Sequence, residues 1–265
     1  MSTTPSTIKH PGVPYTVVGG KRVERKTSAP RVLSVLVLNR GGRFNRADYF
    51  DQLEQLHPDE IISIEPVGTP YDLETLANRH GNLRFLLLHS DTSRGQQVNI
   101  GIQEAHGRFV LVVWNDMAIS ALPSRVLERM HEENILCTTP VFRSDKNEIM
   151  PTIQAPAFYR KLLRVVAVTP TRDNAPTLFP FEYAGLFDRE RFIRTGGFDA
   201  TMVSSYWQKM DFGFRVHMWG ESVRTNLVFR ITCISPPPAE DITPDADHRV
   251  FYLKNLSIRY TGDQG

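Results

Sequence analysis

The chain has 265 residues, of which 41% are hydrophobic and 23% charged, a composition that is typical of a folded domain and excludes intrinsic disorder. Its 31 basic and 29 acidic residues leave a formal net charge of +2, without the clustered basic footprint of a nucleic-acid-binding protein. The two cysteines lack zinc-site spacing, and no apolar segment approaches the roughly 18 residues of a membrane-spanning helix. We therefore expect a cytoplasmic protein with no nucleic-acid partner, and leave peripheral membrane contact and oligomeric state open.

The N-terminal residues 1–30 are rich in proline, serine and threonine and contain a glycine pair, which predicts an extension rather than a packed element. The fold is expected to begin with residues 32–38, an almost continuous apolar run bounded by Pro30 and two glycines. Such a run is typical of a strand buried on both faces of a parallel sheet.

Helical and strand patterns then alternate as far as residue 113. The expected order is helix 49–56, strand 60–64, helix 72–79, strand 83–88, helix 96–105 and strand 109–113. This alternation predicts an α/β fold with a largely parallel sheet, and we assign residues 31–125 to a Rossmann-like, ligand-binding half.

The remainder of the chain is less regular. Residues 126–238 form the expected second half, with helices near 124–134, 189–194 and 207–219 and strands near 135–139 and 223–234. The stretch 140–180 is interrupted by prolines and has no expected element. Residues 239–265 are polar and are expected to be a C-terminal tail.

Polar residues occupy the carboxyl ends of three expected strands, where open α/β sheets bind their ligands. Asn39 and Arg40 end the first strand, Glu65 ends the second, and the strand at 109–113 ends in Trp114-Asn115-Asp116. A carboxylate such as Asp116 can hold a divalent metal beside a diphosphate. It can equally cap the turn that follows, and the local sequence leaves both interpretations open.

Two further segments carry candidate residues. Arg94 and Asn99 lie in a stretch with small residues at 95, 101, 105 and 107, which let a backbone or ligand approach closely, although a packed helix explains them as well. Asp211 and Arg215 are four residues apart, the spacing of an exposed helix pair of little energetic weight. Hydrolase and kinase motifs are missing from the sequence, as are the glycines of a dinucleotide or P-loop site.

Taken together, these segments resemble the large inverting family of GT-A glycosyltransferases that includes bacterial polysaccharide and cell-envelope transferases. The resemblance covers about residues 32–220. It rests on the segments 34–40, 60–65, 94–107 (Arg-Gly-x-x-x-Asn-x-Gly-Ile-x-x-Ala-x-Gly), 109–116, 185–189 and 196–199, and on Asp211. Asp116 stands at the last acid of the family's Asp-x-Asp motif, and Asp211 at the Asp of its Glu-Asp pair.

The resemblance implies transfer of a sugar, with inversion, from a nucleoside diphosphate-sugar to a hydroxyl of a glycan or small acceptor, with uridine as the expected nucleoside and Mg²⁺ or Mn²⁺ as cofactor. The implied donor site comprises Asn39, Arg40, Glu65, Arg94, Asn99, Asn115 and Asp116. The implied acceptor site comprises Gly185, Trp207 and Arg215, with Asp211 as catalytic base. Asp116 and His248 are the candidate metal ligands, although a solvated histidine explains His248 and a core position explains Trp207.

Three positions depart from the family pattern and support an alternative function. Trp114 replaces the first acid of Asp-x-Asp, Met210 replaces the Glu before Asp211, and Glu65 replaces an Asp. The alternative is a catalytically degenerate GT-A module that binds a nucleotide-sugar or glycan without turnover.

Overall fold

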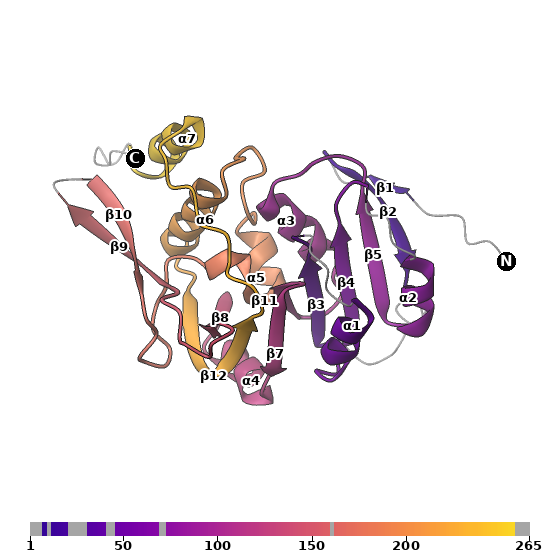
Figure 1. Cartoon of the computed structure of the whole chain (residues 1–265). Helices are drawn as coiled ribbons and strands as arrows, with labels where there is room; N and C mark the ends of the chain where they lie inside the picture. The colour runs from indigo at the N-terminus through magenta and orange to yellow at the C-terminus, as the bar shows by residue number, and fades with distance from the viewer. Residues whose placement is uncertain are drawn as a thin grey trace.

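The computed structural model describes residues 7–9, 12–20, 31–40, 46–68, 73–159 and 162–257. Within these ranges, ten strands form one mixed sheet in the order β1-β2-β5-β4-β3-β6-β11-β8-β12-β7. Figure 1 shows this sheet running through the whole molecule, so both predicted halves share one continuous framework. A single large hydrophobic core follows the sheet from Tyr15 to Cys233. The predicted α/β class is confirmed.

The first half is the parallel part of the sheet. β3 (Leu33–Leu38), β4 (Glu60–Glu65), β5 (Leu83–Leu88) and β6 (Phe109–Trp114) pair in parallel in the order β5-β4-β3-β6. All six residues of β3 are buried, as its apolar sequence predicts, and the one polar residue among them, Ser34, donates its hydroxyl to Glu60 at 2.7 Å. The connecting helices are α1 (Arg46–Glu54), α2 (Leu73–Arg79) and α3 (Arg94–Glu104). These elements match the predicted ones to within a few residues.

The expected N-terminal extension is wrong for the residues before position 21 that the structure describes. β1 (Thr7–Lys9) pairs with β2 (Pro14–Gly19), and β2 pairs antiparallel with β5. The Tyr15 side chain is fully buried, and its hydroxyl donates a 2.8 Å hydrogen bond to Glu104. Because burial of this ring against the edge of the parallel sheet is favourable, residues 14–19 form a strand of the sheet despite the turn-rich composition around them.

The second half extends the sheet in a mixed arrangement. β11 (Gly185–Asp188) runs antiparallel between β6 and β8 (Cys137–Arg143), and β12 (Val223–Cys233) joins β8 to β7 (Met117–Ala121). Its helices are α4 (Ser124–Glu132), α5 (Arg189–Arg194) and α6 (Ser205–Met218), with the short helix η1 (Phe181–Tyr183) before β11. The three predicted helices of this half are confirmed.

A separate hairpin occupies part of the proline-punctuated stretch. β9 (Ile153–Tyr159) and β10 (Leu162–Val168) pair antiparallel and project from the body, as Figure 1 shows. β9 contains Pro156, which pairs opposite Val165 in a two-stranded sheet. Both strands of such a sheet are edge strands, where proline is tolerated.

The expected polar tail is also wrong over part of its length. α7 (Ala246–Asn255) begins at the N-cap Asp245, whose side chain accepts from the His248 backbone N–H at 3.0 Å. Phe251 is buried on α6 in a second apolar cluster with Phe179, Met202, Trp207 and Met210. The C-terminal segment therefore closes over the second half of the fold. No helix in the described ranges is long and apolar enough to cross a membrane.

Candidate functional site

A cavity of about 1020 Å³ opens at the carboxyl ends of β3 and β6. Arg40 follows β3, Trp114 ends β6, and Arg94 begins α3. η1, the start of α6 and the segment before α7 complete the lining. The lining residues are Arg40, Arg94, Trp114, Asp116, Glu182, Tyr183, 203–206, 235, 236, 238–241 and 245–247. Three predicted donor-site residues, Arg40, Arg94 and Asp116, therefore meet in one cavity.

Arg40 is the centre of the charged group in this cavity. Its guanidinium carbon lies 4.1 Å from the centroid of the Trp114 ring, a cation–π distance. Nη2 donates to Glu182 Oε2 at 2.7 Å, and Nη1 lies 3.8 Å from Asp116 Oδ2. The Arg40 side chain is only 14% exposed, so this guanidinium is held in a partly desolvated position between two carboxylates.

Asp116 is itself almost buried. Its Oδ2 accepts a 2.9 Å hydrogen bond from the Ser235 hydroxyl, and its backbone carbonyl accepts from Ile234 N–H at 2.8 Å. Asp116 Oδ1 is buried without a hydrogen-bond partner in the described part of the chain. A buried carboxylate oxygen without a partner is costly unless a ligand or solvent satisfies it.

The turn at η1 holds strained residues against the cavity. Glu182 and Tyr183 have φ angles of 52° and 61°, the left-handed region that side-chain-bearing residues rarely adopt. The Trp114 indole N–H donates to the Glu182 carbonyl at 2.7 Å and fixes this turn. Burial raises the pKa of the Glu182 carboxyl, although Lys209 and Arg40 act in the opposite direction. Strained, buried acids of this kind cluster at functional sites.

Lys209 does not line the cavity but contacts two residues that do, Tyr183 of η1 and Glu240 of the segment before α7. It is fully buried on α6, its ammonium forms an ion pair with Glu240, and it lies 5.1 Å from the centroid of the Tyr183 ring. Glu240 and Tyr183 both line the cavity. The Lys209–Glu240 ion pair therefore holds the segment before α7 next to the cavity.

The amino end of α3 faces the cavity through Arg94. The guanidinium lies 5.4 Å from the Trp114 centroid, and Ser93 caps the helix by accepting from Gln96 N–H. The buried Gln208 supports this end, since its Oε1 accepts from Gly95 N–H at 3.0 Å and its Nε2 donates to Ser93 Oγ at 2.9 Å. A helix N-terminus with an adjacent exposed guanidinium favours anions.

The structure brings Asn39 and Glu65 together, as predicted, but places them beside the cavity rather than among its lining residues. Asn39 Nδ2 donates to the Ile64 carbonyl at 2.6 Å and lies 3.4 Å from Glu65 Oε1. The Glu65 carboxylate is buried and paired with Arg46 at the start of α1. Glu65 is therefore a neutralised, ordered carboxylate at the strand end.

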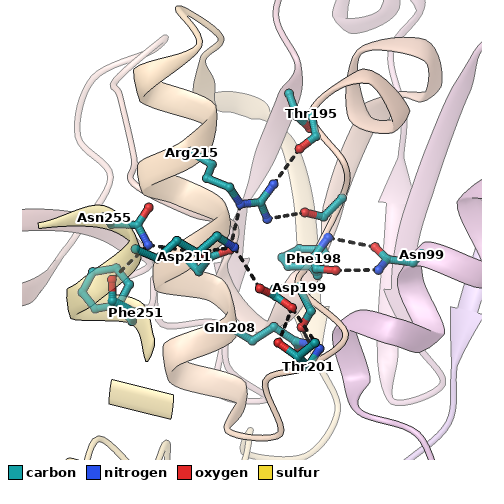
Figure 2. A network of polar contacts seen from close by, with 12 residues as sticks. Asn99, Thr195, Phe198, Asp199, Thr201, Gln208, Asp211, Arg215, Phe251 and Asn255 are labelled. Carbon is teal, nitrogen blue, oxygen red and sulfur yellow. Dashed lines mark hydrogen bonds and ion pairs between the residues drawn. The ribbon is translucent and has the colours of Figure 1, made fainter. Parts of the chain in front are cut away.

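Asp211 is not a lining residue. It is fully buried on α6, and Figure 2 shows Arg215 and Asn255 turned toward it from α6 and α7. Oδ2 accepts from Arg215 Nε at 2.8 Å, while Oδ1 accepts from Asn255 Nδ2 and pairs with Lys254 Nζ, both at 2.9 Å. Both carboxylate oxygens therefore already have partners inside the protein. A role as catalytic base stays a prediction and would require α7 to move aside.

Asp199 joins the same network through Lys254 Nζ at 2.8 Å. Partial burial would raise its pKa, but hydrogen bonds from Lys254 and Thr201 lower the pKa of Asp199 to about 2. Arg215 continues the network to the carbonyls of Thr195 and Gly197, at 2.6 and 2.5 Å. Arg215, predicted to bind the acceptor, therefore holds residues 195–197 after α5 against α6 by hydrogen bonds.

The other predicted site residues have structural contacts in this arrangement. Asn99 exchanges two hydrogen bonds with the Phe198 backbone (Figure 2), and Asn115 Oδ1 accepts from Arg40 N–H at 3.2 Å. Gly185 lies within β11, where an added Cβ would come 3.0 Å from Cys137 Sγ. The Trp207 indole N–H donates to the Thr243 carbonyl at 3.2 Å, and its ring lies tilted against His248 with centroids 4.6 Å apart. His248 is not among the cavity-lining residues.

Sequence reasoning missed Glu182, Lys209 and Glu240, which contribute to or border the cavity. These residues lie far apart in the chain, in a turn, a helix and the segment before α7, so no local spacing indicated them. The one cluster of metal-ligating residues found in the described ranges also lies elsewhere, where Asp51 and Glu54 of α1 meet His80 after α2.

Comparison with solved structures identifies the fold. GalNAc-T7, solved with UDP, GalNAc and Mn²⁺, superposes with a TM-score of 0.59 at 12% identity, covering 81% of this chain and 45% of GalNAc-T7. TarS of S. aureus superposes with a TM-score of 0.57 at 14% identity, covering 87% of this chain and 40% of TarS. Both are glycosyltransferases of the GT-A fold. The chain therefore has the GT-A fold, and at these identities the likeness shows the fold alone.

Sequence comparisons add little. No protein-family model matches the chain. Among curated proteins, peptide deformylase 1B, chloroplastic, of Solanum lycopersicum is 28% identical over 131 residues, covering 48% of this chain and 40% of the deformylase. At this identity and coverage the match does not show a family. The chain spans less than half the length of each of these three proteins.

Proposed function

We propose that the chain is a glycosyltransferase that binds a nucleoside diphosphate-sugar, with uridine as the expected nucleoside, in the cavity at the carboxyl ends of β3 and β6. The observation that carries the proposal is the pair of guanidiniums, Arg40 and Arg94, that share the Trp114 ring in this cavity. Arginine is suited to phosphate because its planar donors match two oxygens at once. The GT-A fold supports the same assignment.

In this proposal residues 31–125 bind the donor and residues 126–238 bind the acceptor, a hydroxyl of a glycan or small molecule. Arg94 and the amino end of α3 contact the diphosphate. Asn39 and Glu65 hold the nucleobase beside the cavity. Inversion at the anomeric carbon requires a base near the acceptor hydroxyl. Asp211 fills that role only with α7 displaced.

The side chains around Asp116 do not fit the expected Mg²⁺ or Mn²⁺ as metal ligands. The unpartnered Asp116 Oδ1 is one suitable ligand. However, Oδ2 accepts from Ser235, the Arg40 guanidinium lies 3.8 Å away, and Glu182 is already paired with Arg40. No group of three metal-ligating side chains in the described ranges includes Asp116 or His248. No step of the proposed reaction is therefore routed through a cation.

The alternative function, a GT-A module that binds a nucleotide-sugar or glycan without turnover, has a specific observation in its favour. On α6, the residue that contacts the lining residues Glu240 and Tyr183 is Lys209, which is not an acid. Asp211, the predicted base, is buried away from the lining. Donor binding without release of nucleotide in the presence of any acceptor would favour this alternative.

The proposal is tested by thermal unfolding of the full chain with nucleoside mono- and diphosphates and their sugars, each with manganese and with chelator. A ligand that binds only the folded state raises the melting temperature, and at a hundredfold excess over Kd it adds about 2.7 kcal/mol. We expect uridine diphosphate and its sugars to give the largest shift. A panel in which no nucleotide raises the melting temperature would contradict the proposal.

The base-binding assignment predicts the effect of Glu65→Gln. The substitution preserves the shape of the side chain but removes the charge that pairs with Arg46 and orders Asn39. We expect uridine diphosphate to bind more than threefold more weakly, which corresponds to about 0.7 kcal/mol. Calorimetric titration measures this change, and inorganic pyrophosphate, which lacks the base, serves as the control ligand. An unchanged Kd for uridine diphosphate would remove Glu65 from the donor site.

A further inference from the structure

Arg40 occupies the position where an external cation would have to bind. Its guanidinium contacts Glu182 Oε2 at 2.7 Å and lies 3.8 Å from Asp116 Oδ2, so it lies between a carboxylate of η1 and a carboxylate that follows β6. Those carboxylates would repel a diphosphate if nothing neutralised them. The neutralising charge is already present and is part of the polypeptide.

Trp114 holds that charge in place. A tryptophan ring attracts a guanidinium over its face, and the two are 4.1 Å apart here. The ring is itself fixed, since it is 2% exposed and its indole N–H donates to the Glu182 carbonyl. The same residue therefore positions both Arg40 and the acid that pairs with it.

Two polar atoms of the Arg40–Asp116–Glu182 group are free to bind a ligand. Arg40 Nε and Asp116 Oδ1 are both buried without hydrogen-bond partners in the described part of the chain. Arg94 adds a second guanidinium at 5.4 Å from the same ring. Two guanidiniums on one indole can approach the two phosphates of one diphosphate.

We propose that Arg40, stacked on Trp114, supplies the positive charge that the donor diphosphate requires, so that the chain binds its nucleotide without a divalent cation. This inference rests on the proposed function, because it concerns how the same cavity holds its donor. The ligand class is a nucleoside diphosphate or its sugar, recognised through its phosphate oxygens. Arg40 is a binding residue in this account, and Trp114 and Glu182 are positioning residues.

The test is calorimetric titration of the full chain with uridine diphosphate, in manganese and in chelator. For the unaltered protein we expect Kd values that agree within about threefold. Arg40→Gln is expected to weaken binding in chelator by about tenfold or more, since it removes a charge-assisted contact. Manganese should restore part of this loss, because Asp116 and Glu182 then lack their internal counter-ion. Arg40→Lys keeps the charge and should bind better than Arg40→Gln in chelator.

Arg191→Gln is the matched control. Arg191 is partly buried and pairs with Glu221 at 2.9 Å, as Arg40 pairs with Glu182, but it does not line the cavity. The Kd of Arg191→Gln for uridine diphosphate should stay within about twofold of that of the unaltered chain. Melting temperatures without ligand show whether each variant folds. If Arg40→Gln does not fold, the unaltered chain and Arg40→Lys still decide the question.

The outcomes distinguish failure of the inference about Arg40 from failure of the proposed function. Uridine diphosphate binding that disappears in chelator and returns with manganese would overturn the inference about Arg40 and leave the proposed function standing. Binding by Arg40→Gln in chelator that equals the unaltered chain would also overturn it. Failure of every nucleoside diphosphate to bind under both conditions would overturn the proposed function, and the inference with it.

Discussion

Replacing Asp211 with alanine is expected to destabilise the fold by about 3–5 kcal/mol, the cost of removing one partner from a buried ion pair. The carboxylate is fully buried and meets Arg215, Lys254 and Asn255 at 2.8–2.9 Å. Its loss would leave Arg215 without its counter-ion and release α7 from α6. For a domain of this size the melting temperature should fall by about 10 °C, measured by calorimetry or circular dichroism.

The exposed acid Asp145 provides the control for this experiment. Asp145→Ala should change stability by no more than about 0.5 kcal/mol, as is usual at the surface. A melting temperature of Asp211→Ala equal to that of Asp145→Ala would show that the network in Figure 2 carries no stability.

Asp211→Asn separates a structural role from a catalytic one. A catalytic base predicts that turnover falls by roughly 10²–10⁴ while stability and donor affinity are kept. A purely structural role predicts lower stability, unchanged donor affinity and a turnover per folded molecule within about tenfold of the unaltered chain. Nucleotide release is the measurement. A loss of turnover without a loss of stability would establish the base and require α7 to open during the reaction.

Gly95→Ala is expected to destabilise the junction of α3 and α6 by about 2–4 kcal/mol, through overpacking and a broken buried hydrogen bond. A Cβ at Gly95 would fall on Gln208 Oε1 and lie 2.6 Å from Phe198 Cβ. Gln208 would have to leave the hydrogen bonds that it makes with Gly95, Ser93 and Tyr183. Chemical denaturation measures the change in the free energy of unfolding. Donor affinity should fall too, because Arg94, the first residue of α3, would move with the displaced amino end of the helix.

Gly220→Ala is the matched control, because it adds the same methyl group where nothing lies within 4 Å. Its φ of 75° should cost about 1–2 kcal/mol by itself. If Gly95→Ala cost no more than this control, the close approach of α3 to α6 would not limit stability, and the small residue at position 95 would need another explanation.

The sequence predicts the parallel half of the fold well for a physical reason. β3, β4 and β6 are buried on both faces, so they are mostly apolar and end close to where their apolar residues end. That regularity also located Arg40 and Asp116, since residues at the ends of neighbouring parallel strands meet at one edge of the sheet. Arg94 came from the segment 94–107, whose small residues resemble the family pattern, and the structure places it at the start of α3.

The remaining elements depend on contacts between distant segments. Tyr15 is buried where β2 meets the edge of β5, and Phe251 is buried where α7 meets α6. The flanking sequences look polar or turn-rich by themselves, because these partners are distant in the chain. Asp211 and Lys209 illustrate the same limit within one helix. Two residues apart, they lie on different sides of α6, and only packing decides which of them borders the cavity.

We propose that the cavity beside Trp114 binds a nucleoside diphosphate-sugar. The most direct measurement is calorimetric titration of the full chain and of Arg94→Gln with uridine diphosphate and its sugars. The account predicts a Kd between about 1 μM and 1 mM for the unaltered chain, the range of typical enzyme substrates, and binding about tenfold weaker for Arg94→Gln. The absence of binding at millimolar nucleotide, or equal affinity for both proteins, would contradict it.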